Sequence, residues 1–257
     1  MLGLDPYAGL YWNSGANVIT TAVDVKTQDD MYALGTKQPR VTGPMIPFPV
    51  SDARTRFPER LQELRAGAPL RIVIATGGSL THGQEIAALC GAFARLTSAQ
   101  EVERISVVVG DSLPMKESAA RAAGGDPRVS IVHDTDPTRL VRAADGAIAG
   151  ADLIIAKTGE LAFCVAGGKA FKAFHTHPSL GPQEIAIREY VTATSAARGV
   201  SALELGLPPA AEVSRILKQR ADGSLFDMMA AGLFVPEDGA YRVAQMIQRE
   251  LKGLQPE

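Results

Sequence analysis

Five apolar, strand-like runs in this sequence each end at a polar or glycine-rich cluster, and this repetition restricts the folds that the chain can adopt. Segments with the apolar spacing of helices separate the runs, which is typical of strand–helix–strand units with right-handed crossovers. The carboxyl ends of parallel strands share one edge of a sheet, where ligands bind. The five runs are Arg71–Ala75, Ile105–Val109, Val129–Val132, Asp152–Ala156 and Lys169–Phe174. We therefore expect an α/β fold with a doubly wound parallel sheet and a ligand site at that edge.

Two of the expected helices have a clear apolar face. The first places its apolar residues three and four positions apart, as expected of a helix that lies on a sheet. These residues are Ile86, Leu89, Cys90 and Phe93. The last helix, Ala240–Leu251, has an apolar stripe that we expect to be buried, formed by Ala240, Val243, Ala244, Ile247 and Leu251. Further helices are expected at 118–123, 138–143, 211–220 and 225–231.

Prolines between Pro39 and Pro58 precede these alternating elements. Proline removes a backbone donor and keeps the preceding residue out of the helical region, so we expect a connector there. Before it lie only a strand at Asn17–Val23 and short segments at Met31–Leu34 and Arg40–Thr42. These few elements cannot enclose a core of their own. They therefore either pack onto the main domain or form the last part of a preceding domain. We predict a remnant N-terminal domain with its connector at 1–56 and the main domain at 57–257.

Composition excludes several classes of protein. The net charge is −2 and the sequence pI is near 6.1. The Lys and Arg residues are dispersed and form no positively charged stripe that would attract nucleic acid, so nucleic acid is not expected as a partner. No apolar run reaches the roughly 18 residues of a membrane span, and no export leader is recognisable, which predicts a cytoplasmic protein. Cys90 and Cys164 lack metal-ligand spacing and are predicted to be core thiols.

The segment Gly77-Gly78-Ser79 follows a strand and opens a helix. Backbone donors there can approach an anion closely and the helix dipole favours it, which suits a diphosphate. Thr81 and His82 would add a hydroxyl and an imidazole. The alternative is a tight turn that binds nothing. The segment matches neither the dinucleotide fingerprint nor the P-loop, which disfavours dinucleotide oxidoreductases and nucleoside triphosphatases.

Three further clusters end strands. Lys157-Thr158-Gly159-Glu160 would bring a cation to the same crevice, and the alternative is a solvated lysine at a strand end with Thr158 as an ordinary helix cap. His175 and His177 lack a third ligand, so we expect surface or substrate contacts rather than a metal site. The cluster from His133 to Asp136 reads either as a ligand contact or as a capped helix start.

In this order, the glycine turn, the segment Gly150–Gly159 and the loop with Pro178 and Gln183-Glu184 resemble the C-terminal half of GT-B glycosyltransferases. The nearest branch holds the MurG-type and diacylglycerol glycosyltransferases. The resemblance covers about residues 17–251 and implies a Rossmann-like domain that binds a nucleotide-diphosphate sugar, usually a uridine one. That domain faces an acceptor-binding N-terminal half, and no cofactor or metal is implied.

The resemblance also assigns roles to residues. Gly77, Gly78 and Ser79 would lie by the diphosphate, and His133 would lie where the family's backbone meets the base. Lys157, Thr158 and Gly159 would form the loop beside the donor, and Gln183-Glu184 would take the place of the donor-loop glutamine. Val165 stands where the family commonly has a ribose-binding glutamate, a role that Glu160 would have to take over.

These assignments lead to a hypothesis of glycosyl transfer to an acceptor hydroxyl. His82 and Lys157 are the candidates to stabilise the departing diphosphate, and Asp24 is the one carboxylate nominated as general base. One alternative is a non-catalytic nucleotide-sugar-binding subunit that needs a partner domain. Another is a sensory or scaffolding domain that no longer binds the donor, prompted by Val165. Relatives often act on lipid acceptors, so peripheral membrane contact is also open.

Overall fold

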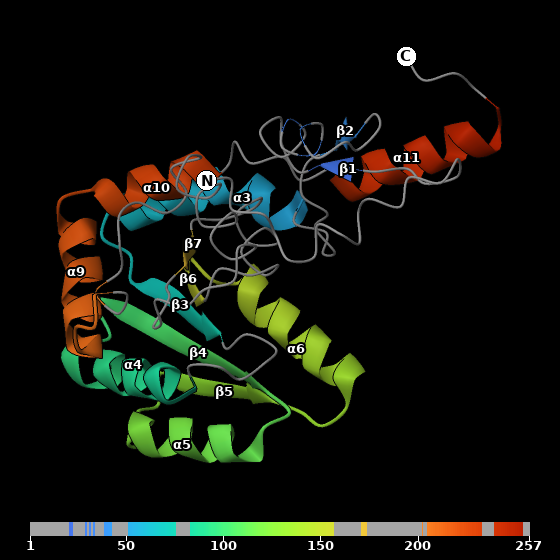
Figure 1. The fold of residues 1–257 in the computed structure, drawn as a ribbon. Coiled ribbons are helices and arrows are strands. Elements are labelled where there is room, and N and C mark those ends of the chain that lie inside the picture. The colour runs from blue at the N-terminus through green and yellow to red at the C-terminus, as the bar shows by residue number, and fades with distance from the viewer. Residues whose placement is uncertain are drawn as a thin grey trace.

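The computed structural model describes residues 21–22, 29, 31, 33, 39–42, 51–75, 83–156, 171–173, 202, 205–232 and 239–253 of the 257-residue chain. Its centre is a five-stranded parallel sheet of order β5-β4-β3-β6-β7 (Figure 1). The strands are β3 (Leu70–Ala75), β4 (Val102–Gly110), β5 (Val129–His133), β6 (Leu153–Ala156) and β7 (Phe171–Ala173). The chain builds outward from β3 first on one side and then on the other, so the sheet is doubly wound and Rossmann-like, as predicted.

One face of the sheet packs into the main core. Ile72 of β3, Ile105 of β4 and Leu153 of β6 are neighbours in register on this face, and all are at most 1% exposed. Five helices add side chains to the same core: α3 (Ser51–Arg65), α4 (Gly83–Leu96), α5 (Leu113–Ala123), α9 (Pro209–Ala221) and α10 (Ser224–Gly232). Helix α6 (Pro137–Ala149) adds none to it and contacts β4 and β5, which agrees with a place on the opposite face.

The predicted inner face of α4 is confirmed, because Ile86, Leu89, Cys90 and Phe93 are all buried. Burial raises the pKa of the Cys90 thiol to about 11, which keeps it protonated at neutral pH. Helices α4 and α5 approach closely at Gly91, where an added Cβ would lie 2.7 Å from the carbonyl oxygen of Ala122. Glycine is therefore needed at this contact.

A buried ion pair joins α3 to the start of β6. Asp152 is 2% exposed. Its carboxylate accepts hydrogen bonds from Nε of Arg60 at 2.9 Å, from Nη2 of Arg60 at 2.8 Å and from the backbone N–H of Arg71 at 2.8 Å. Nη2 of Arg60 also donates to the carbonyl oxygen of Pro69 at 2.8 Å, and the pairing raises the pKa of the guanidinium. Asp152, at the start of β6, thus connects α3 and β3, two segments that are distant from it in sequence.

Helix α3 corrects the prediction of a connector that reaches Pro58. The helix begins at Ser51 and carries Pro58 in its interior, so it also crosses the expected domain boundary between residues 56 and 57. An interior proline costs about 3 kcal/mol. Phe57, Leu61 and Leu64 are 2%, 7% and 1% exposed, and burying each such side chain contributes about 1.5–3 kcal/mol, which offsets that cost. The division into two domains stays a prediction.

A second, smaller sheet lies apart from the main one. Strands β1 (Thr21–Ala22) and β2 (Arg40–Val41) pair in parallel, and β1 lies within the strand expected at Asn17–Val23. An ion pair of 3.0 Å between Arg40 and Glu250 links β2 to α11 (Gly239–Leu251). In Figure 1, α11 extends away from the five-stranded sheet, beside β1 and β2.

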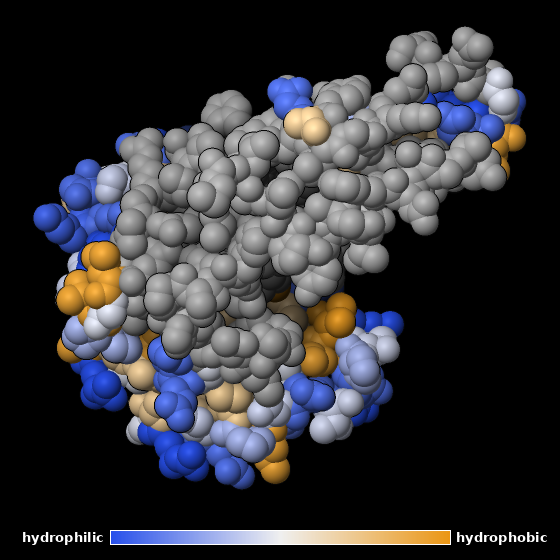
Figure 2. All heavy atoms as spheres, in the orientation of Figure 1, coloured by the Kyte–Doolittle hydropathy of each residue, from blue (hydrophilic) through white to orange (hydrophobic). Residues whose placement is uncertain are grey.

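The prediction that α11 buries its apolar stripe is wrong. Ile247 and Leu251 are 47% and 83% exposed, Ala240 and Ala244 are exposed, and Val243 is half-buried. Figure 2 shows apolar surface at the far end of this helix. The periodicity identified an apolar face correctly, but a helix buries such a face only where another element covers it.

The other helices lie where the sequence predicted, with shifted ends. Helix α5 begins at Leu113 because the hydroxyl of Ser112 accepts a hydrogen bond from the backbone N–H of Met115, and α6 continues to Ala149. Helices α9, α10 and α11 confirm the helical C-terminal region. Within the part of the chain that the structure describes, no helix combines the length and apolar character needed to cross a membrane.

Candidate functional site at the carboxyl edge of the sheet

The order of the strands puts the topological switch point of the sheet between β3 and β6. The chain winds from β3 to β4 and β5 on one side of the sheet, and returns to β6 and β7 on the other. Ala75 and Ala156, the last residues of β3 and β6, are direct partners in the parallel register. Segments that leave neighbouring strands in opposite directions open a crevice at the carboxyl edge, which is where doubly wound sheets bind ligands. The glycine turn and the lysine cluster follow directly in the sequence after these two residues.

Most of the predicted site residues lie outside the described residues. This applies to Gly77, Gly78, Ser79, Thr81, His82, Lys157, Thr158, Gly159, Glu160, Gln183 and Glu184. It also applies to Asp24, Cys164, Val165, His175 and His177. Their convergence on one ligand stays a prediction. What the structure contributes is the register of the two strand ends from which the first two clusters depart.

His133 is the predicted site residue that the structure does describe. It ends β5 and pairs in register with Gly110 of β4, whose φ of 69° lies in the left-handed region. Alternation along β5 places His133 on the same face as Val129 and Ile131, which pack against the main core. Its Nε2 atom is buried and has no hydrogen-bond partner among the residues that the structure describes. The sequence placed this residue at the edge of the sheet, but it gave no sign of the unpaired atom.

The turn after His133 confirms the predicted helix cap. The carboxylate of Asp136 accepts hydrogen bonds from the backbone N–H groups of Thr138 at 2.8 Å and Arg139 at 3.1 Å, so it caps α6. Asp134 accepts two hydrogen bonds from the guanidinium of Arg139, both at 3.0 Å, and this pairing lowers the pKa of Asp134 to about 2. Both carboxylates are therefore engaged by the protein itself, and sequence reasoning missed the Arg139 contact.

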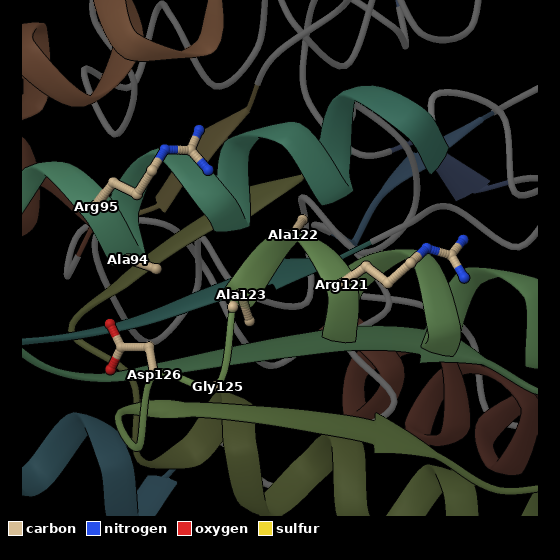
Figure 3. Close-up of a pocket in the computed structure, with 8 residues that line it drawn as sticks. Ala94, Arg95, Arg121, Ala122, Ala123, Gly125 and Asp126 are labelled. Atoms are coloured by element: carbon tan, nitrogen blue, oxygen red, sulfur yellow. The ribbon is translucent and has the colours of Figure 1, made fainter.

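A shallow hollow of about 500 Å³ lies elsewhere, between the C-terminal ends of α4 and α5 (Figure 3). Arg95 and Arg121 line it together with Asp126. Nη2 of Arg128 donates to the Asp126 carboxylate at 2.6 Å, and the hydrogen bonds from Arg128 lower the pKa of Asp126. The ends of α4 and α5 lead into the amino ends of β4 and β5, so the hollow lies at the edge opposite the crevice. It is not the candidate site.

Comparisons with known proteins agree with the topology. No protein-family model and no curated protein sequence matches the chain. Among solved structures, MurG from Acinetobacter baumannii superimposes with a TM-score of 0.51 at 18% identity, over 72% of this chain and 53% of MurG. A putative UDP-N-acetylglucosamine 2-epimerase from Listeria monocytogenes gives a TM-score of 0.61 at 14% identity, over 93% of this chain and 61% of the epimerase. The UDP-GlcNAc 2-epimerase from Neisseria meningitidis bound to UDP-GlcNAc gives 0.56 at 12% identity, over 97% and 68%.

These likenesses define the class of fold. The chain has a GT-B glycosyltransferase-like fold, which confirms the fold expected from the sequence resemblance. The chain spans about half of the MurG structure and about three fifths of the Listeria epimerase, with 53% and 61% of their lengths covered. Because one fold supports many chemistries, the activity of the chain has to be argued from its site.

Proposed function

We propose that this chain binds a nucleotide-diphosphate sugar, most simply a UDP-sugar, in the crevice between β3 and β6 and transfers the sugar to an acceptor hydroxyl. The observation that carries the proposal is the register of Ala75 with Ala156, the two residues that precede the glycine turn and the lysine cluster in the sequence. The bound UDP-GlcNAc of the Neisseria epimerase supports a ligand of this class. Such neighbours are enzymes, which does not favour a non-catalytic subunit.

In this proposal the described strands carry a site formed by the segments that follow them. Gly77, Gly78, Ser79 and Thr81 cradle the diphosphate, with Thr158, Gly159 and Glu160 on the other side of the crevice. Gln183 and Glu184 contact the sugar or ribose. His82 and Lys157 offset the negative charge that grows on the diphosphate as its bond to the sugar breaks. Donors preorganised in this way contribute about 3–4 kcal/mol each to lowering a barrier.

The acceptor side of the reaction needs further protein surface. MurG and the Listeria epimerase are longer than the part that this chain matches, with 53% and 61% of their lengths covered. We propose that an acceptor-binding half, in the same polypeptide or in a partner, completes the crevice and supplies the general base. Asp24 stays the nominated carboxylate within this chain. A cytoplasmic location and a peripheral contact with membrane lipids stay predictions.

A thermal-shift panel of nucleoside diphosphates tests donor binding. UDP at high concentration is expected to raise the melting temperature more than ADP, GDP or CDP, because a ligand that binds the folded state stabilises it by mass action. Gly78→Val should abolish the rise, since a side chain there blocks the approach of the diphosphate. Gly146→Ala on α6 is the matched control, because an added Cβ there has no atom within 4 Å. A chain that binds no nucleoside diphosphate would refute the proposal and would support a scaffolding domain.

The likeness to two 2-epimerases supports a second candidate, because both cover more than nine tenths of this chain, at 93% and 97%. The two activities differ in their need for an acceptor. Incubation with UDP-GlcNAc alone, followed by proton NMR, would reveal a new C2 epimer for an epimerase. A transferase leaves the donor unchanged until an acceptor hydroxyl is supplied, and then releases UDP.

Lys157→Ala is expected to slow the transferase reaction by about 10²–10³-fold with little change in UDP binding.

A further inference from the structure

Helix α11 has one side that faces the rest of the chain and another side that faces solvent. The residues of the first side recur at helical spacing and are Gly239, Val243, Met246 and Glu250. Gly239 is buried, the next two are half-buried, and Glu250 pairs with Arg40 of β2 at 3.0 Å. Each residue turns a helix by about 100°, so the apolar stripe, which starts one residue later, points away from this first side. The helix is therefore anchored to β2 with its apolar stripe left outside.

The apolar stripe lies on a part of the molecule that projects from the rest. It comprises Ala240, Ala244, Ile247 and Leu251, with Tyr241 at its margin. Ile247, Leu251 and Tyr241 are 47%, 83% and 65% exposed. Figure 1 shows α11 extending away from the five-stranded sheet, and Figure 2 shows apolar surface beside hydrophilic surface at the far end of the helix. A flat surface can therefore reach the stripe without meeting the sheet.

The charges of this helix are unbalanced. The segment 239–253 holds Arg242, Arg249 and Lys252 against a single carboxylate, Glu250, whose charge is offset by its pairing with Arg40. Arg249 and Lys252 are exposed, and the helical rotation places both more than about 100° away from the apolar stripe. The whole chain carries a net charge of −2, so the excess of cations is local to α11. The helix thus combines an uncovered apolar face with a basic polar face.

We propose that α11 lies along the surface of an anionic membrane, with the apolar stripe toward the acyl chains and the cations among the lipid phosphates. Amphipathic helices with a basic polar face bind membranes in this way, with the apolar face buried by about 5–10 Å. A helix is only about 10 Å across and Lys and Arg have long apolar stems, so Arg249 and Lys252 still reach the phosphates. A protein groove has to enclose both flanks of the stripe, and the side that faces β2 already takes one flank. A planar lipid surface needs the stripe alone.

This inference goes beyond the proposed function and does not depend on it. The sequence resemblance left membrane contact open and named no surface of this chain for it. The inference names that surface by its residues, the stripe from Ala240 to Leu251 and the two exposed cations of the same helix.

Sedimentation of the full chain with lipid vesicles tests the surface. The protein should pellet with phosphatidylcholine vesicles that contain about 30% phosphatidylglycerol, and should stay in the supernatant with the same amount of pure phosphatidylcholine vesicles. Leu251→Ser should weaken binding to the anionic vesicles about tenfold, because the leucine no longer enters the acyl region. The double variant Arg249→Gln, Lys252→Gln should weaken it about 20- to 30-fold, which is about fivefold for each cation. Sodium chloride at about 0.5 M should release the wild type, since salt screens the cations.

Two controls separate the stripe from general effects. Leu113→Ser on α5 removes a leucine that is 54% exposed on another element, and it should bind the vesicles as the wild type does. Leu251→Ser should leave the melting temperature unchanged, because the side chain is 83% exposed in the folded protein.

Three outcomes overturn the inference. The first is a wild type that does not bind anionic vesicles, and the second is an equal loss of binding for Leu113→Ser and Leu251→Ser. The third is a stripe that binds protein instead, which predicts a dimeric wild type and a monomeric Leu251→Ser variant in light scattering, with no binding to vesicles. Vesicle binding and the UDP thermal shift are separate measurements, so the failure of one leaves the other standing.

Discussion

Removal of the carboxylate of Asp152 is expected to be among the most damaging single substitutions in this protein. Asp152 is 2% exposed and accepts two hydrogen bonds from Arg60 and one from the backbone N–H of Arg71. Asp152→Ala removes the acceptor of the Arg71 N–H and leaves the Arg60 guanidinium with only the Pro69 carbonyl and the exposed Glu63 carboxylate, and breaking a buried pair in this way costs about 3–5 kcal/mol. That is a large part of the roughly 5–15 kcal/mol of a typical domain. Urea unfolding at neutral pH, followed by circular dichroism, measures the loss.

A double-mutant cycle separates the ion pair from general damage at this place. Arg60→Met should also destabilise, because it leaves the Asp152 charge buried with one backbone donor. The double variant should lose at least about 2 kcal/mol less than the sum of the two single losses, since the pair is already broken. Glu63→Ala removes the exposed partner of the same guanidinium, at 2.8 Å, and should cost less than about 1 kcal/mol. Additive single losses, or a loss below about 1 kcal/mol for Asp152→Ala, would show that the pair does not hold α3 to β6 as described.

Three further predictions follow from the described contacts. Gly91→Ala should lower the unfolding free energy by up to about 2 kcal/mol, because the clash with the carbonyl of Ala122 outweighs the helix propensity of alanine. Gly146→Ala should raise the unfolding free energy by up to about 1 kcal/mol. Equal effects of the two variants in urea unfolding would contradict this prediction. The pKa of Asp126 is lowered from its ordinary value of 3.8, so the unfolded chain takes up a proton before the folded one and stability falls as the pH drops below about 4. Asp126→Asn should weaken this acid dependence in melting scans from pH 5 to 2, and an unchanged slope would count against the pairing with Arg128. In a Cys164→Ser background, the thiol of Cys90 should resist Ellman's reagent at pH 8 until urea unfolds the protein, because it is buried with a pKa of about 11; rapid labelling of the folded protein would refute its burial.

The sequence predicted those features of the fold that are decided by residues close together in the chain. The apolar runs identified the five strands, and the spacing from Ile86 to Phe93 identified the buried face of α4. Capping chemistry offered a helix start at the cluster from His133 to Asp136 as one of two readings, and Asp136 does cap α6. Each of these features is decided within a few residues, by side-chain periodicity or by one hydrogen bond to a nearby backbone group.

Features decided by distant contacts were not predictable in the same way. Proline at position 58 argued against a helix, yet the core contacts of Phe57, Leu61 and Leu64 stabilise one. The stripe on α11 resembled a buried face, and only the arrangement of the other elements showed that it is exposed. The candidate site combines both situations. Motifs nominated its segments, whereas the register of Ala75 with Ala156 and the unpaired nitrogen of His133 required coordinates.

The pairing of Arg60 with Asp152 spans 92 positions, and this separation matters while the chain is being synthesised. At about 5–20 residues per second, the ribosome delivers Asp152 roughly 5–20 s after Arg60. During that interval β3 can already pair with β4, but its other side, reserved for β6, is an open strand edge. Open edges recruit foreign strands, so the nascent protein passes through a period in which chaperone protection matters most. This period ends once Asp152 and β6 have been synthesised, because the carboxylate that pairs with Arg60 also accepts the hydrogen bond from the N–H of Arg71 at the start of the exposed edge of β3.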